Sequence, residues 1–291
     1  MDCASHANVT RFETYCQRRE KEALEAPLSG FYTIEDASAG YDLVSLGSDW
    51  TRRLFDGNFY RVRERPGEFP LTSLVFVQSR DGNTVVPDPA TLGGGPVDFN
   101  LIYEGLSRVA ADAVAAGAAT VGKKVFFSVW HPEIVALRCE LGLPRHPAQV
   151  VVSRRGHVNL EQSLLFNVPD VRVFLVIGPE GLGPLEKALS DRPWITVVPL
   201  MNGDLTDAFR RLRRDHGLTR ISVVGGPTVA TSLVDQGLIQ DLCLTTSAFE
   251  GGQPNTPFYA GDRSPTLELI VRKRGTDATA ITFEQFAVAN V

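Results

Sequence analysis

The sequence predicts an α/β fold with a central, mostly parallel mixed sheet that helices flank on both faces. From residue 71 onward, short apolar runs rich in β-branched residues alternate with segments of helical spacing. Several of these runs are continuously apolar, which is typical of parallel strands covered by helices on both faces. Two strand-like runs close the chain without a helix between them, and alternation followed by late strands indicates a mixed sheet.

The composition is that of a globular protein. The chain has 291 residues, of which 43% are hydrophobic and 22% charged, so it can bury a sizeable core. The net charge of −5 argues against a general nucleic-acid binder. The four cysteines form no C-x-x-C pair, so we expect reduced thiols and no metal site. Without an 18-residue apolar stretch or the apolar core of a signal peptide, we expect a cytoplasmic protein with no membrane partner.

Residues 1–70 differ in composition and pattern from the rest and are interpreted as an N-terminal extension that is partly helical. Residues 12–26 are charge-rich, contain few β-branched residues and predict a helix. Pro and Gly within residues 61–70 mark a boundary. The predicted organisation is therefore an extension over 1–70 and a larger α/β domain over 71–291.

Within the second part, apolar runs predict the strands and helical spacing predicts the helices. The expected strands are 71–79, 148–153, 171–178, 195–200, 221–224, 241–249, 267–275 and 280–288. The expected helices are 101–114, 205–217 and 228–236.

The junction after the strand at 221–224 is the first candidate for a ligand site. Gly225-Gly226-Pro227-Thr228 leads directly into a helical pattern. Such a turn offers free backbone N–H groups and the positive end of the helix dipole to a phosphate. Glycines let the phosphate approach the backbone, proline suits the first helical turn, and the threonine adds a hydroxyl. A tight turn with no ligand is the alternative interpretation.

A second candidate follows the strand at 148–153. Ser153 and Arg154 come at its carboxyl end, where cofactor phosphates collect in open parallel sheets. A hydroxyl and a guanidinium together suit a single phosphate monoester. A diphosphate turn plus a separate monoester site indicates NADPH in preference to NADH.

Other glycine-rich and basic segments are given a structural interpretation. Residues 117–124 match G-x-x-x-x-G-K, but Lys124 stands where a nucleoside-triphosphatase loop needs Ser or Thr, and the following segment is β-prone. Residues 178–184 are read as a loop, and the basic run 210–220 as the solvated face of a helix. His131, beside a glutamate, is the one histidine considered near chemistry, although a position on a surface loop is favoured.

Four segments in register resemble the reductase domain of riboflavin biosynthesis, the C-terminal domain of the bifunctional deaminase–reductase, which has the dihydrofolate reductase fold. They are "SRDG" (79–82), similar to S-L-D-G; "RVAADAVAAGAATV" (108–121), which matches R-x-x-x-D-A-V-x-x-G-x-x-T-V; "VVVSRRG" (150–156); and "VVGGPTVATSLVDQGLIQDLCLT" (223–245). The resemblance covers about residues 71–286.

The resemblance implies NADPH stretched along the carboxyl edge of the sheet, and usually a homodimer with the late strands at or near the interface. Arg154 is our own assignment as the partner of the 2′-phosphate. Arg108 matches a substrate-binding arginine, Ser79 belongs to the same pocket, and Asp81 closes it and is the expected catalytic residue, with a bound water as the alternative proton source. The other cofactor-binding residues expected are Thr120, Ser153, Gly225, Gly226, Pro227, Thr228, Val229 and Ala230.

The sequence departs from the family on the substrate side. Val224 stands where the family commonly has a glutamate that touches substrate, and Val75 where it often has a lysine. The family's A-D-D-P run is replaced by residues 122–132. We therefore expect an NADPH-dependent reduction of a C=N or C=O group in a small pyrimidine- or pterin-like substrate. A non-catalytic NADPH or nucleotide sensor, and a dihydrofolate reductase, remain as alternatives.

Overall fold

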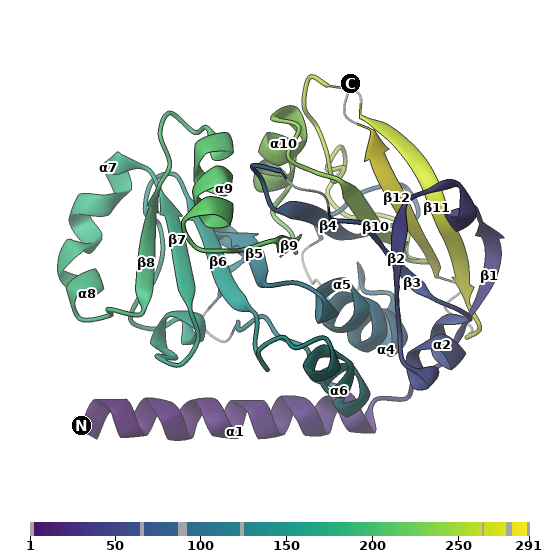
Figure 1. Ribbon diagram of the computed structural model, residues 1–291, viewed down its shortest axis with the longest axis horizontal. Coiled ribbons are helices and arrows are strands. Elements are labelled where there is room, and N and C mark those ends of the chain that lie inside the picture. The colour runs from purple at the N-terminus through teal and green to yellow at the C-terminus, as the bar shows by residue number, and fades with distance from the viewer. Residues whose placement is uncertain are drawn as a thin grey trace.

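The structure is a computed structural model that describes the backbone of residues 3–64, 67–86, 92–122, 125–263, 265–277 and 281–289, and side chains from residue 11 onward. Lys123, the last residue of the G-x-x-x-x-G-K match, and Lys124 after it lie outside the described residues. Ten strands form one sheet in the order β1-β11-β12-β10-β4-β9-β5-β6-β7-β8 (Figure 1). All pairs from β10 to β8 are parallel, and those from β1 to β10 are antiparallel. The predicted mixed, mostly parallel sheet is confirmed.

The strands of this sheet are β1 Phe31–Asp36, β4 Leu71–Gln78, β5 Ala113–Gly117, β6 Ala148–Ser153, β7 Val173–Ile177, β8 Ile195–Pro199, β9 Arg220–Val223, β10 Asp241–Thr246, β11 Thr266–Gly275 and β12 Thr282–Ala289. A separate antiparallel pair is formed by β2 Leu43–Leu46 and β3 Phe59–Val62.

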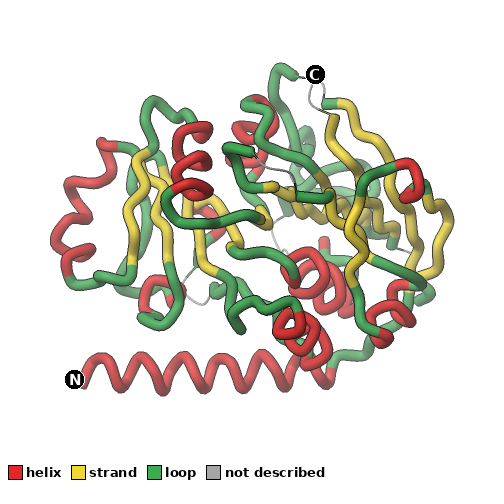
Figure 2. The backbone as a smooth tube through the Cα atoms, viewed as in Figure 1, coloured by secondary structure: helices red, strands yellow, loops and turns green. Residues whose placement is uncertain are grey.

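The helices are α1 Cys3–Glu25, α2 Asp49–Phe55, α4 Gly95–Val97, η2 Asp98–Leu106, α5 Ser107–Val109, α6 Pro132–Glu140, α7 Pro179–Leu182, α8 Glu186–Ser190, α9 Leu205–Arg214 and α10 Pro227–Asp235. Figure 2 shows that helices and loops cover both sides of the sheet.

Two apolar clusters fill the two faces of the sheet, because successive side chains of a strand point to opposite faces. In β5, Ala113 and Ala115 face the cluster that contains the apolar residues of α9 and α10. Val114 and Ala116 face the other cluster, which includes residues of η2, α5, α6 and α1. Figure 1 shows α9 and α10 on one side and α5, α6 and α1 on the other.

The expected helix over 101–114 is wrong at its carboxyl end. The helical stretch stops at Val109, and residues 113–117 form β5, a fully buried strand between β9 and β6. Its Ala-rich composition favours a helix locally, but the strand packs under α10, where a Cβ on Gly117 would lie 3.1 Å from Val229 Cγ2. Small side chains are therefore required by tertiary packing, which overrides local propensity.

The segment that follows also differs from expectation. Residues 125–131 make no strand, and α6 begins at Pro132. His131 is the N-cap of this helix, because its Nδ1 accepts the backbone N–H of Glu133 at 3.3 Å. Its ring stacks on Trp50 with centroids 4.1 Å apart, and the residue is buried. The favoured surface position for His131 is therefore wrong, and its role is structural.

The N-terminal segment contributes more than the one predicted helix. The predicted helix is present as α1, and β1 adds an antiparallel strand to the edge of the sheet by pairing with β11. The β3 strand is tied to the core by Arg61, which forms a buried ion pair with Asp241 at 3.2 Å and also donates to Ser73 Oγ at 3.0 Å.

Candidate active site

The residues predicted for the cofactor converge at the carboxyl edge of the sheet. The strands β4, β9, β5 and β6 are consecutive neighbours and all run parallel, so the segments that follow them lie along one edge. Those segments are 79–83, 224–228, 118–120 and 153–156. The structure thus brings together four stretches that are far apart in the sequence.

The turn after β9, here called the glycine cradle, is formed by Gly225 and Gly226 directly before helix α10. Gly225 and Gly226 have φ of 113° and 89°, a region that other residues rarely adopt. The turn is anchored by a hydrogen bond from Val224 N–H to Ala115 O at 2.9 Å. No side chain caps the nine-residue helix α10, whose N-cap is Gly226. The first N–H groups of α10 are thus not taken by a capping side chain and suit an anion.

Thr120 links this cradle to the neighbouring cavity. A Cβ added to Gly226 would lie 3.6 Å from Thr120 Oγ1, so the threonine side chain flanks the turn. The same residue lines a cavity of about 300 Å³. Thr228, in the first turn of α10, is exposed, whereas Val229 and Ala230 are buried against the sheet.

The loop after β6 is held close to the helix that follows β7. Ser153 is buried, and Arg154 is exposed. A Cβ on Gly178 would lie 2.4 Å from Arg154 O, and one on Gly181 would lie 2.3 Å from Gly156 N. The loop that carries Arg154 can therefore pack against segment 178–184 only because Gly178 and Gly181 have no side chains. The segment itself contains the short helix α7, so its interpretation as a loop is wrong.

The loop after β4 is ordered by its own polar groups. The buried Ser79 accepts the N–H of Asn83 at 3.0 Å through its Oγ. The exposed Asp81 accepts the N–H of Gly251 at 3.0 Å and Asn83 Nδ2 at 3.1 Å. The backbone hydrogen bond from Gly251 is the main reason why the pKa of Asp81 is lowered. Asp81 is thus a carboxylate at neutral pH. It joins the loop after β4 to the loop that contains Gly251.

The cavity beside Thr120, here called the arginine pocket, is rich in arginine and aromatic side chains. Arg108 is fully buried; its Nη1 donates to Ser128 O at 2.9 Å and lies 3.6 Å from Glu104 Oε1. Its guanidinium lies over the Tyr103 ring, 4.3 Å from the centroid. The pocket is lined by Tyr15, Arg18, Arg19, Phe99, Tyr103, Glu104, Arg108, Thr120, Val125, Phe126 and Phe127.

Several residues of the site escaped the sequence interpretation. Glu104 precedes Arg108 by four residues, a spacing that favours ion pairs on helices and could have indicated the pair. Arg19, which contacts Glu104 Oε2 at 2.5 Å, comes from α1, and no sequence feature near Arg19 indicates that it belongs to the site. Burial raises the pKa of Glu104, while Arg108 and Arg19 oppose the rise.

Asp98 is another buried carboxyl that was not predicted. It lies at the start of η2 and accepts the Thr245 hydroxyl of β10 at 2.5 Å. Burial raises the pKa of Asp98 to about 6, and hydrogen bonds from Thr245 and Gly94 limit the rise. Its pairing with β10 places it close to the carboxyl end of β4, since Thr245 is opposite Val77.

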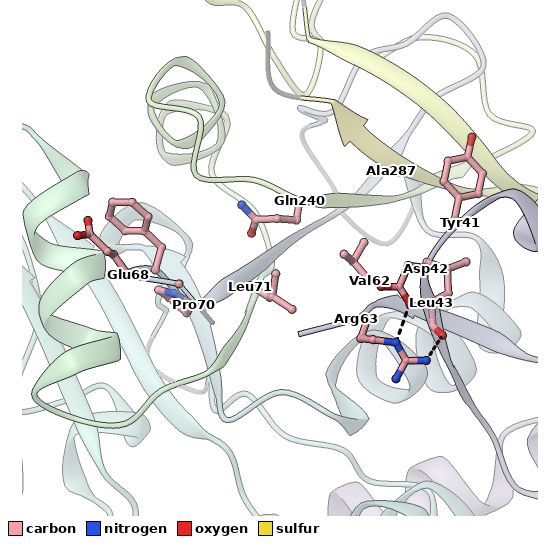
Figure 3. Close-up of a pocket in the computed structure, with 12 residues that line it drawn as sticks. Tyr41, Asp42, Leu43, Val62, Arg63, Glu68, Pro70, Leu71, Gln240 and Ala287 are labelled. Atoms are coloured by element: carbon pink, nitrogen blue, oxygen red, sulfur yellow. Dashed lines mark hydrogen bonds and ion pairs between the residues drawn. The ribbon is translucent and has the colours of Figure 1, made fainter. Parts of the chain in front are cut away.

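A second cavity, of about 440 Å³, lies at the opposite edge of the sheet (Figure 3). Its lining includes Leu71 and Gln240, which stand at the amino ends of β4 and β10. On its other side Arg63 donates to Asp42 Oδ1 at 2.6 Å and to Leu43 O at 3.3 Å. Figure 3 shows this pair facing away from Gln240. None of the predicted site residues lines this cavity.

Over the described ranges, no group of three His, Cys, Asp or Glu side chains is placed to hold a metal ion. In the same part of the chain no helix is long and apolar enough to cross a membrane.

Comparison with known proteins places this geometry in a family. Residues 81–281 match the family described as the RibD C-terminal domain. A pyrimidine reductase-like protein from Corynebacterium diphtheriae is similar in structure, with a TM-score of 0.62 at 20% identity over 76% of this chain and 93% of that one. Among curated proteins no significant match to the chain is found.

Two riboflavin-biosynthesis proteins have related structures. RibD of Acinetobacter baumannii gives a TM-score of 0.57 at 18% identity, over 76% of this chain and 58% of the RibD chain. The riboflavin biosynthesis reductase Rib7 of Saccharomyces cerevisiae gives 0.54 at 14% identity, over 78% and 93%.

The doubly covered sheet with a glycine turn at its carboxyl edge defines a mixed α/β protein with the fold of the pyrimidine reductase-like protein and of RibD. Because the family match spans more than half of its length, the chain belongs to the RibD C-terminal domain family.

Proposed function

We propose that the protein is an NADPH-dependent reductase that transfers a hydride to a C=N or C=O carbon of a small pyrimidine- or pterin-like heterocycle. The observation that carries this proposal is the position of Thr120, which flanks the glycine cradle and also lines the arginine pocket. A dinucleotide held in the cradle would therefore extend beside a cavity large enough for a small heterocycle. Membership of the riboflavin reductase family supports the same reaction class.

The chain's own residues fit NADPH at two places. The turn at Gly225 and Gly226, with the uncapped start of α10, would hold the diphosphate through backbone N–H groups. Ser153 and the exposed Arg154 would hold the 2′-phosphate. When bound, NADPH supplies the hydride from its nicotinamide ring.

On the acceptor side, the residues bind, orient and shield the substrate. The aromatic lining offers flat apolar surfaces that suit a planar ring and exclude water. Arg108 would orient the polar edge of that ring. Since Asp81 has a lowered pKa and is ionised, we assign the proton to a bound water, and Asp81 keeps the loop beside the site ordered.

Titration of the full chain with NADPH, followed by a panel of pterins, pyrimidines and cyclic imines, tests the proposal. We expect saturable NADPH binding and loss of NADPH absorbance with at least one acceptor. Tight NADPH binding with no turnover by any acceptor would instead support a non-catalytic sensor. Turnover confined to dihydrofolate would identify a dihydrofolate reductase, and absence of NADPH binding at millimolar concentration would overturn the proposal.

A further inference from the structure

We infer that the N-terminal helix α1 forms one wall of the acceptor site, where Arg18 and Arg108 bind an anionic substituent of the ligand and Arg19 is a positioning residue for Arg108. The site is a pocket for a flat ring that carries a carboxylate or a phosphate. Only the statement that this ligand is the hydride acceptor rests on the proposed function; the anion site itself does not.

The helix α1 lies outside the region that matches the family, yet it is fixed to the domain by specific side-chain contacts. Phe12 packs edge-on against Phe126 with ring centroids 4.7 Å apart. Glu20 forms an ion pair with Arg145 at 2.8 Å. These contacts lie on both sides of Tyr15, Arg18 and Arg19 in the sequence, so the helix presents these three residues to the pocket at a defined position.

The charges that line the arginine pocket do not balance. Among the described residues of the lining there are three arginines, at positions 18, 19 and 108, and a single carboxylate, Glu104. Glu104 contacts Arg19 at 2.5 Å and Arg108 at 3.6 Å. A further carboxylate, Glu22, pairs with Arg19 at 2.7 Å and Arg18 at 3.6 Å but is half exposed, so water screens it. An excess of positive charge in the pocket favours an anion.

Arg108 has hydrogen-bonding capacity that the described residues leave unused. Its Nη1 is satisfied by Ser128 O, but Nε and Nη2 are buried and have no partner in the described part of the chain. Buried donors without a partner are unfavourable, and a charged acceptor would satisfy them in a bidentate way. The guanidinium lies over the rings of Tyr103 and Phe127, so a ligand reaches it by displacing one of these rings.

Arg18 is accessible to the anionic substituent, because it lines the same pocket as Arg108 and is partly open to solvent. Its side chain is 53% exposed and lines both the arginine pocket and an adjoining cavity of about 190 Å³. Arg19, by contrast, is mostly covered and committed to Glu104 and Glu22. We therefore assign direct contact to Arg18 and Arg108, and to Arg19 the alignment of Glu104 and, through it, of Arg108.

Calorimetric titration of the full chain with two pairs of probes tests the inference. N-benzoylglutamate is compared with neutral benzamide, and ribose 5-phosphate with ribose. We expect at least one anionic probe to bind about tenfold more tightly than its neutral partner, as expected from one charge-assisted contact. The pair that shows the difference identifies the anion as a carboxylate or a phosphate. Equal affinity within both pairs would overturn the inference.

Variants of α1 separate the site from general charge effects. Arg18→Gln and Arg19→Gln should weaken the anionic probe about tenfold and leave its neutral partner unchanged, and Arg19→Lys should restore binding because it keeps a cation beside Glu104. Lys21→Gln is the matched control, since Lys21 is on the same helix, is 72% exposed and does not line the pocket. An equal loss in Lys21→Gln would show that only overall charge matters and would contradict the inference.

The result is independent of the test of the proposed function. NADPH affinity of the same variants should be unchanged, because α1 does not contribute to the glycine cradle. Anion binding without any NADPH binding would leave the site in place and overturn only the reductase proposal. NADPH binding with no preference for the anionic probes would overturn the anion site and leave the reductase proposal in place.

Discussion

Individual residues in this protein have their roles set by backbone conformation as much as by side-chain chemistry. Gly226 has a φ of 89°, and a Cβ added to it would lie 3.6 Å from Thr120 Oγ1, an ordinary contact distance. An alanine would thus find space there but would strain the backbone by about 1–2 kcal/mol. Strain at this turn displaces the N–H groups proposed to hold the diphosphate.

Gly226→Ala should therefore weaken NADPH binding about tenfold, measured by fluorescence titration. The matched control is Gly217→Ala, because Gly217 also has a positive φ, of 70°, has open space around it and lies at the end of α9. We expect both variants to lose similar stability, but only Gly226→Ala to lose affinity. Equal affinity of the two variants would mean that the turn does not hold the cofactor.

Arg154 should decide between the two nicotinamide cofactors. Arg154→Gln removes the guanidinium proposed for the 2′-phosphate, so the preference for NADPH over NADH should fall about tenfold or more, since a charge-assisted bond is lost. Arg155→Gln is the control, because Arg155 is also exposed and is the next residue in the same loop. An unchanged cofactor preference in Arg154→Gln would place the 2′-phosphate elsewhere.

Asp98 should make stability depend on pH. Because burial raises its pKa to about 6 from 3.8, folding favours the protonated form. This contribution is fully present below about pH 4 and is lost as pH rises through 6, a change of about 3 kcal/mol for a two-unit shift. In Asp98→Asn this part of the pH dependence should disappear, as urea unfolding at pH 4.5 and 8 would show. If the free energy of unfolding of Asp98→Asn changed between these two pH values as much as that of the unmodified protein, the burial argument would be contradicted.

At the level of elements, the sequence predicts those whose local pattern agrees with their environment. Strand β6 was predicted at its observed bounds, because a continuous Val-rich run has few other stable placements. For strand β5 the sequence predicts only the end of a helix, at residue 114, and no strand, because its alanines favour helix locally and the need for small side chains comes from α10, more than 100 residues later. Strand β1 was missed because its exposed side chains show no regular burial pattern.

The buried ion pair between Arg61 and Asp241 should be a strong attachment of the β2–β3 pair to the core. Arg61→Met leaves Asp241 buried without its partner, which costs about 3–5 kcal/mol of the free energy of unfolding. Arg63→Met is the control, because Arg63 pairs with Asp42 at the surface, where such pairs contribute about 0–1 kcal/mol. Urea unfolding of both variants measures the difference, and similar losses would show that the buried pair is not the stronger attachment.

At the scale of the whole molecule, the two halves of the candidate site differ in how far the sequence reveals them. The cofactor side is built from short segments directly after strands, so each carries its own local signal, as Ser153 and the Gly225–Gly226 turn do. The acceptor side depends on contacts between distant segments. Arg19 meets Glu104 across 85 residues, and nothing near either residue indicates this contact before the fold is known.

The quaternary structure expected from the family is a homodimer with the late strands at or near the interface, and the fold adds a constraint to that expectation. In this chain β1 pairs with β11 and forms the edge of the sheet beside the late strands. Tyr32 and Ile34 of β1 are 47% and 49% exposed, so this edge strand presents two large side chains to solvent. A second copy that contacts the late strands from this side must therefore also contact β1.

We accordingly predict that the protein sediments at twice its chain mass of 31.8 kDa and that Ile34→Asp shifts it towards the monomer, because a carboxylate in an apolar interface is costly to desolvate. Met201→Asp is the matched control, since Met201 is equally open, at 53%, but follows β8 at the opposite edge of the sheet. Sedimentation velocity over a range of concentrations measures both. A dimer that survives Ile34→Asp and dissociates with Met201→Asp would place the interface at the β8 edge, where the parallel half of the sheet ends.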